Sequence, residues 1–389
     1  MRSFVVGGAV RDALLGLPVK DHDHVVVGAT PEQMLAAGYR AVGKDFPVFL
    51  HPDTHEEYAL ARTERKTAPG YHGFVFHAAP DVTLEQDLVR RDLTINAMAR
   101  GEDGAIVDPH GGRRDLEARL FRHVSDAFAE DPVRILRTAR FAARLPEFTV
   151  AEDTNALMRR MVAAGEVDAL VPERVWQELA RGLMEIQPSR MLAVLRDCGA
   201  LARLLPELEA CWETPLPGQP DTATGVRLMQ VIDAAAAQGL ALEARFAVLM
   251  AASGRDALEP VQAVCARLKV PNECRDLALM AVREQGVVIR AEELDAAALV
   301  GLLERCDALR KPERFAQMLL ALACSVMPTP AAAWPQGARL LAALAAARAV
   351  NAGEVAQRCG ERKERIPEAV RQARIGAVAS ALGTAAPAA

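Results

Sequence analysis

Long hydrophobic runs, a surplus of positive charge and paired cysteines are all missing from this chain of 389 residues, of which 51% are hydrophobic and 25% charged. No run reaches the roughly 18 apolar residues of a membrane span, and the N-terminal apolar stretch is too short for a signal peptide. A net charge of −5 means that any polyanion site must come from local clusters. We therefore expect a cytoplasmic protein of two or three domains, at about 150 residues each, without membrane association.

Cysteine and histidine are unevenly distributed. The seven cysteines are scattered and none are spaced C-x-x-C, which fits reduced, mostly buried thiols and excludes a zinc ribbon. All eight histidines lie between His22 and His123. This inventory excludes a histidine-ligated metal site from residues 124–389.

The periodicity of the chain changes near residue 115. Before it, short β-type runs alternate with segments whose apolar residues are spaced as in a helix, which predicts a small sheet with a few helices. Thr30-Pro31 is a typical helix start. After it, segments rich in Ala, Leu, Arg and Glu have helical periodicity and predict an all-α remainder. Pro- and Gly-rich stretches at 213–220 and 327–330 predict linkers or long loops.

Two carboxylates, Asp21 and Asp23, precede the second β-type run. In extended structure residues i and i+2 project from one face, and two hard oxygen ligands in that geometry suit Mg²⁺. Upstream, Gly7 and Gly8 lie between a strand and a helix, where backbone N–H groups can approach a phosphate, and Arg11 can add a charge-assisted contact. A D-x-D alone is common in solvated loops, but the combination predicts a phosphate site that uses a metal.

Two further clusters are dense in arginine. Residues 90–97 place an arginine pair beside an aspartate and an asparagine, which can clamp phosphates and a ribose hydroxyl, or can form a solvated helix end. Asp131 precedes a helix with Pro at its first position, and Arg134 and three later arginines fall within about 120° of one face. Asp131 and Arg134 together can read a base edge, one accepting and one donating hydrogen bonds. The alternative is a solvated face, although few acids are interleaved with it.

These segments resemble the motifs of class II nucleotidyltransferases, which are the CCA-adding tRNA nucleotidyltransferases and the bacterial poly(A) polymerases. Residues 6–16 with 21–23 resemble the first motif, 90–97 the second, and 130–134 the E-D-x-x-R template for the incoming base. Residues 46–66 are similar to the proteobacterial CCA-adding type. The resemblance is dense over 1–145 and thinner but continuous beyond.

The resemblance implies an α+β protein with a nucleotidyltransferase head of the polymerase-β type, a small mixed sheet with helices, followed by an all-α neck, body and tail. The head would comprise residues 1–125, and a neck at 126–212 would carry the base template and RNA contacts. A degenerate HD-like helical domain would follow at 223–325, and a helical tail at 338–380.

The resemblance also implies a mechanism with two Mg²⁺ ions held by Asp21 and Asp23. One ion would lower the pKa of the tRNA 3′-hydroxyl, and the other would neutralise the triphosphate and the leaving pyrophosphate. CTP and ATP would be the substrates that extend tRNA. Glu57, in a β-type run, is a candidate third carboxylate.

The resemblance further implies which residues contact the nucleotide. Gly8, Arg11 and Arg91 would bind the triphosphate and sugar. Asp131 and Arg134 would pair with the Watson–Crick edge of cytosine or adenine. Two more arginines would complete the nucleotide pocket: Arg137 and Arg140.

The chain departs from the family pattern at residues 243–255, within the HD-like domain. Residues 243–255 resemble the stretch that carries the His-Asp pair of a metal-dependent phosphohydrolase, but Ala251-Ala252 occupies that position. Arg255 stands where a lysine is usual. Because alanine cannot ligate a metal, we expect a helical scaffold without phosphatase or phosphodiesterase activity.

The helical arm is expected to grip the acceptor and TΨC stem of tRNA by shape, through backbone and 2′-hydroxyl contacts. Basic residues near the C-terminus form a candidate patch, but interleaved glutamates favour a solvated amphipathic helix there. These basic residues are Arg358, Arg362, Lys363, Arg365, Arg371 and Arg374. No stable protein partner is expected.

Two alternatives remain open from sequence. One keeps the chemistry and changes the product, to poly(A) or to partial CC or A addition. The other is an RNA-binding protein with a dead catalytic head, which the intact carboxylates Asp21 and Asp23 argue against.

Overall fold

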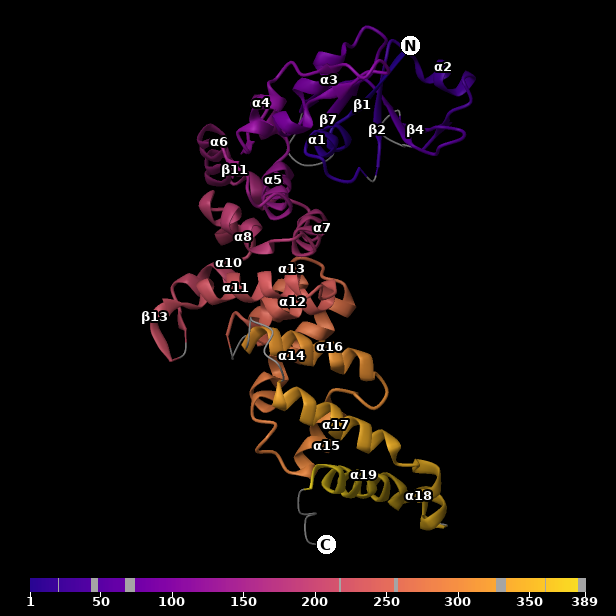
Figure 1. Ribbon diagram of the computed structural model, residues 1–389, viewed down its shortest axis with the longest axis vertical. Helices are drawn as coiled ribbons and strands as arrows, with labels where there is room; N and C mark the ends of the chain where they lie inside the picture. The colour runs from indigo at the N-terminus through magenta and orange to yellow at the C-terminus, as the bar shows by residue number, and fades with distance from the viewer. Residues whose placement is uncertain are drawn as a thin grey trace. The chain divides into compact units, whose positions relative to one another are not determined.

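The computed structural model describes residues 1–19, 21–42, 48–66, 74–216, 218–254, 258–326, 334–360 and 362–383 (Figure 1). Contacts along the chain divide it into two compact units. The first comprises Met1–Glu178 and Arg190–Leu204, and the second comprises Leu179–Ser189 and Leu205–Ala389. Within the described ranges, no helix is long and apolar enough to cross a membrane. The finer domain boundaries given above stay predictions.

The first unit is built on a seven-stranded mixed sheet in the order β3-β4-β5-β2-β1-β8-β9. At its centre β1 (Arg2–Val6) runs antiparallel to β2 (Asp23–Val27), and β2 runs parallel to β5 (Glu57–Leu60). This confirms the sheet indicated by the β-type runs and the mixed topology that the resemblance implies. The other strands are β3 (Arg40–Ala41), β4 (Val48–Leu50), β8 (Ala99–Arg100) and β9 (Ile106–Val107), and a separate hairpin joins β6 (Thr63–Lys66) to β7 (Phe74–His77).

Alternation along β2 gives the sheet two apolar faces. Val25 and Val27 pack in one cluster with Leu84 and Leu88 of α3 (Leu84–Val89), whereas Val26 packs in another with Met34 of α2 (Pro31–Ala36). The expected start of α2 is confirmed, because Thr30 and Gln33 form a reciprocal capping box with Pro31 at the first position. With both faces covered, the polar ends of the strands are left for chemistry.

Helices follow the sheet in the first unit. The helix α1 (Gly8–Leu14) leaves the end of β1. The helix α5 (Val133–Arg144) carries the four arginines predicted to share one face, here called the arginine row: Arg134, Arg137, Arg140 and Arg144. The remaining elements are α4 (Gly112–Glu117), α6 (Glu152–Ala163), α7 (Pro172–Leu183), α8 (Pro188–Asp197), α9 (Ala200–Leu204) and the parallel pair β10 (Leu120–Phe121) and β11 (Thr149–Val150).

The second unit is helical around α12 (Leu242–Ala251), which packs against α11, α14 and α16 and is buried from Ala244 to Ala251. Six of the seven cysteines are buried, and burial raises the pKa of Cys306 to about 12, as expected for inert thiols. The helices are α10 (Pro206–Glu209), α11 (Thr224–Ala237), α13 (Leu258–Arg267), α14 (Asn272–Ile289), α15 (Ala296–Arg305), α16 (Pro312–Val326), α17 (Pro335–Ala349), α18 (Ala352–Cys359) and α19 (Ile366–Leu382).

One prediction for the helical part of the chain, the loop at 213–220, was wrong. The stretch at 213–220, expected to be a linker or long loop, contributes to a two-stranded hairpin of β12 (Pro215–Leu216) and β13 (Gln219–Ala223). Its strands contain prolines, which a hairpin without further neighbours tolerates because both strands are edges. The second predicted break, at 327–330, lies outside the described residues.

Candidate active site

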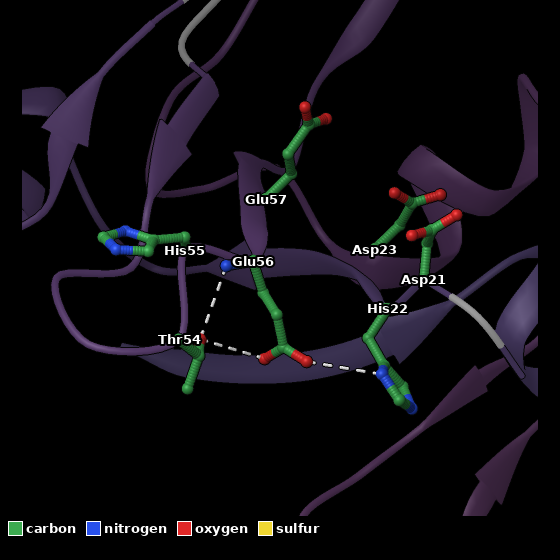
Figure 2. A pocket seen from close by; sticks show the side chains of 7 residues that line it. All are labelled: Asp21, His22, Asp23, Thr54, His55, Glu56 and Glu57. Carbon is green, nitrogen blue, oxygen red and sulfur yellow. Dashed lines mark hydrogen bonds and ion pairs between the residues drawn. The ribbon is translucent and has the colours of Figure 1, made fainter.

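The two carboxylates of the D-x-D lie at the start of β2. Asp23 is paired with Val6 of β1 on one side and with Glu57 of β5 on the other. Figure 2 shows Asp21 and Asp23 side by side, with Glu57 on the neighbouring strand. Together with four neighbours they line a cavity of about 630 Å³, and the other lining residues are His22, Thr54, His55 and Glu56. The sheet register therefore brings Glu57 next to the predicted metal ligands.

The carboxylates do not form a complete metal cage. Within the described ranges, no three His, Cys, Asp or Glu side chains are gathered so that they could hold a metal ion by themselves. Asp21 and Asp23 are both exposed, and hard oxygen ligands of this kind suit Mg²⁺, which keeps waters and takes further oxygens from substrate phosphates. The donor set thus fits Mg²⁺, whose remaining positions would be filled by waters or phosphate oxygens.

The glycine turn beside Asp23 is tightly constrained. Gly7 has a φ of 71°, and its N–H donates to the carbonyl of Met98 at 3.2 Å. A Cβ atom built on Gly7 would lie 3.0 Å from Nη1 of Arg91. Arg91 therefore lies against the backbone of the turn, and its Nε atom is buried without a hydrogen-bond partner among the described residues. A phosphate oxygen is a natural acceptor for such a group.

We expect Gly7→Ala to weaken nucleotide binding as well as stability. The left-handed φ disfavours any Cβ, and the added atom would displace the Arg91 guanidinium, so we expect a loss of about 1–3 kcal/mol in the free energy of unfolding. Gly16→Ala is the matched control, because Gly16 has a φ of 68° but, among the described residues beyond its two chain neighbours, no atom lies within 4 Å of the position that a Cβ would take. Urea unfolding should detect both substitutions, whereas KM for CTP, the substrate that the resemblance implies, should rise only for Gly7→Ala. A normal KM would contradict the placement of Arg91.

The guanidinium of Arg11 is fixed by hydrogen bonds to neighbouring side chains. Its Nη1 donates to Oδ1 of Asn96 at 2.6 Å and its Nε donates to Oδ1 of Asp12 at 2.8 Å. Asp12 in turn accepts from Arg144 of α5 at 2.7 Å. Burial lowers the pKa of Arg11, and the Asp12 carboxylate opposes this shift. The first motif, the second motif and α5 are thereby joined through one guanidinium.

A residue that the sequence did not single out positions the arginine pair. Asp87 of α3 is fully buried, and it accepts from Nη2 of Arg90 at 2.6 Å and from Nη2 of Arg91 at 3.2 Å. Burial raises the pKa of Asp87, but the two guanidinium groups outweigh burial and hold it below its ordinary value. Asp87 thus stays charged and fixes the pair beside the glycine turn.

The arginine row of α5 is not a solvated face. Arg137 donates from Nε to Oδ2 of Asp92 at 2.8 Å, and Arg140 donates from Nε to Oε2 of Glu178 at 2.6 Å. Arg137 and the Asn96 amide hold the pKa of buried Asp92 far below its usual range, although burial itself would raise it. The acids that balance the row come from other parts of the chain, which is why few are interleaved with it in sequence.

The predicted base-reading pair has separate partners. Asp131 accepts from Nη2 of Arg174 at 2.8 Å and from Nη1 of the same guanidinium at 3.3 Å. Arg134 is buried and donates to two backbone carbonyls, those of Arg90 at 2.7 Å and Ala127 at 3.0 Å. Asp131 is therefore held by α7, whereas Arg134 ties α5 to the second motif.

Arg174 and Glu178 were missed from the sequence, and so was Asp87. The two α7 residues are four apart and share a helix face, but their partners lie 43 and 38 residues upstream. No local pattern indicates such a pairing.

The chain resembles known proteins along almost its whole length. A family model described as the Poly A polymerase head domain matches residues 3–122, and one described as the probable RNA and SrmB-binding site of polymerase A matches residues 147–211. The Multifunctional CCA protein of Herminiimonas arsenicoxydans is 61% identical, with 98% of each chain covered. That of Cupriavidus necator is also 61% identical, covering 98% of this chain and all of the relative. This chain belongs to the CCA-adding tRNA nucleotidyltransferase family.

A solved structure agrees with this membership. The crystal structure of the Bacillus stearothermophilus CCA-adding enzyme in complex with CTP superposes with a TM-score of 0.70 at 26% identity, covering 96% of this chain and 89% of that one. In this CCA-adding enzyme the first matched segment contains Gly8, Arg11, the D-x-D and Arg91, and the second contains Arg174 and Glu178. The residues predicted to read the base, between Asp131 and Arg140, lie between the two segments.

Proposed function

We propose that this tRNA nucleotidyltransferase adds C, C and A in sequence to the 3′ end of tRNA from CTP and ATP, releasing pyrophosphate. The observation that carries the proposal is the register of the sheet, in which Asp23, the second carboxylate of the D-x-D and the first residue of β2, is paired with Val6 next to the glycine turn that ends β1. Carboxylates that suit Mg²⁺ thus adjoin backbone and arginine groups that suit a triphosphate. A cytoplasmic location is part of the same proposal.

An extension assay tests this function. Purified protein receives tRNA transcripts that end at the discriminator base, after C or after CC, with labelled CTP or ATP and Mg²⁺. Addition of C, C and A followed by a stop is expected. A ladder of A on any RNA would instead indicate a poly(A) polymerase, and binding without incorporation would indicate an RNA-binding protein.

In this proposal each group has a chemical task. Asp21 and Asp23 would hold two Mg²⁺ ions, which when bound supply Lewis-acid activation of the 3′-hydroxyl and neutralise the triphosphate. Gly8 at the start of α1, Arg11 and Arg91 would bind the triphosphate and sugar. Glu57, which the register places beside Asp23, is proposed as a third carboxylate. Arg137 and Arg140, each held by a carboxylate, would complete the nucleotide pocket.

Base choice is assigned to Asp131 and Arg134. We expect Asp131→Ala to degrade the preference for CTP over UTP while part of the phosphoryl transfer remains, because Asp131 supplies an acceptor to the exocyclic amine and takes no part in bond formation. Initial rates with each nucleoside triphosphate measure this. If CTP and UTP lost rate in equal proportion, Asp131 would be structural.

The HD-like segment is proposed to be a scaffold only. Ala251 ends α12 and is buried, Ala252 follows as its cap, and no histidine occurs after His123. Arg255 lies outside the described residues. We therefore expect no metal-dependent hydrolysis of a 2′,3′-cyclic nucleotide. Hydrolysis that persisted in Asp21→Ala protein would contradict this.

The proposal also assigns the binding of tRNA. Shape recognition of the acceptor and TΨC stem would fall to the helical arm. Near the C-terminus Arg358, Arg362, Lys363 and Arg365 are exposed, whereas Arg371 pairs with Glu304 at 3.2 Å. Whether this patch contacts tRNA stays a prediction.

A further inference from the structure

The acceptor capacity of Asp131 is almost fully used. Its Oδ1 accepts from the N–H of Val133 at 3.1 Å and from Nη1 of Arg174 at 3.3 Å. Its Oδ2 accepts from Nη2 of Arg174 at 2.8 Å. A carboxylate oxygen has two lone pairs, so within the described ranges one acceptor position remains, on Oδ2. The side chain is 21% exposed, which leaves that position accessible to a ligand.

The remaining acceptor matches a feature that cytosine and adenine share. Both bases present an exocyclic amine as a donor on the Watson–Crick edge, whereas uracil and guanine present a carbonyl oxygen at the equivalent place. A carboxylate fixed with one lone pair toward this edge attracts the amine and repels the carbonyl. Discrimination of this type requires that the carboxylate cannot turn away from the wrong base.

The fork of Arg174 supplies that restraint. Two donors on one planar guanidinium engage both oxygens of Asp131, so rotation of the carboxylate would break two charge-assisted bonds. Arg174 lies on α7, and a second contact one turn further along this helix holds it against α5: buried Glu178 accepts a hydrogen bond from Arg140 at 2.6 Å. Both of these partners, Asp131 and Arg140, belong to the proposed nucleotide pocket.

We propose that Arg174 is a positioning residue for base choice, which holds Asp131 so that bases with an exocyclic amine are accepted and bases with a carbonyl there are rejected. Glu178 holds the same helix in place through Arg140. The inference rests on the proposed role of Asp131 and extends it to a residue outside the stretch between Asp131 and Arg140.

The test measures kcat/KM for CTP and for UTP on tRNA that ends at the discriminator base. In Arg174→Ala the preference for CTP is expected to fall by about tenfold to a hundredfold, since one well-oriented base contact is lost. Arg174→Lys should recover only part of it, because a point charge cannot form the fork. Arg159→Ala is the matched control, since Arg159 is an exposed arginine of the same unit whose pair with Glu152 spans 3.7 Å; it should keep the wild-type preference.

A double variant separates positioning from stability. If Arg174 acts through Asp131, then Asp131→Ala combined with Arg174→Ala should show no more loss of preference than Asp131→Ala alone. Equal losses of rate with CTP and UTP in Arg174→Ala, or additive losses of preference in the double variant, would overturn the proposal for Arg174 and leave the role of Asp131 intact. An unchanged preference in Asp131→Ala would overturn the base-template assignment itself, and the positioning role with it.

Discussion

Asp21→Asn is expected to lower the rate of C addition by about a thousandfold or more, with little change in the free energy of unfolding. The substitution keeps the size of the side chain but removes the charge that a divalent cation requires. Asp21 is exposed, so we expect its change to shift stability by less than about 0.5 kcal/mol. Single-turnover incorporation of labelled CTP measures the rate, and urea unfolding measures the stability.

Asp53→Asn is the matched control for this experiment. Asp53 is also an exposed carboxylate of the first unit, but it does not line the cavity beside the D-x-D. Its change should leave incorporation within about twofold of wild type, since surface substitutions away from a site have small effects. Incorporation that survived in Asp21→Asn would rule out Asp21 as an essential metal ligand. It would move that role to Glu57, the neighbouring carboxylate on β5.

The sequence reveals this site where its signals are local. A glycine pair after a strand and two carboxylates two residues apart are patterns of a few residues, and the sheet register then places them together as expected. The strands of the head and the helical remainder were predictable for the same reason, because period and capping act over a single element, whereas the mixed topology of the sheet was implied by the family resemblance. The family resemblance added roles to residues that the local patterns had already marked.

The residues that hold the site in shape could not be predicted in this way. Asp92 meets Arg137 across 45 residues, and Arg174 meets Asp131 across 43. Such pairs depend on tertiary packing, and each member alone resembles a solvated surface charge in sequence. The arginine row of α5 illustrates the consequence: its balancing acids come from α7, from α1 and from the second motif.

Arg245→Met is expected to destabilise the second unit by about 3–5 kcal/mol and to leave the chemistry of the first unit intact. Arg245 of α12 is buried, and its guanidinium donates to four backbone carbonyls, those of Leu183, Glu185, Ala236 and Leu240. Methionine has a similar length but no donor, so each of these carbonyls would lose the hydrogen bond from Arg245. Hydrogen–deuterium exchange should show lost protection in α12 and α14 and retained protection in β1 and β2.

The matched control for this loss is Arg310→Ala. The side chain of Arg310 is 77% exposed and pairs with Asp307 at 3.3 Å, a surface contact worth less than about 1 kcal/mol. Unchanged protection in Arg245→Met would mean that α12 does not depend on this guanidinium. Lost protection together with normal C addition to a short acceptor stem would show that the second unit contributes structure rather than chemistry. Ala251 and Ala252 lie at the end of this same helix, at the positions where the family resemblance predicts a His-Asp pair, and alanine cannot ligate a metal, so we expect that outcome.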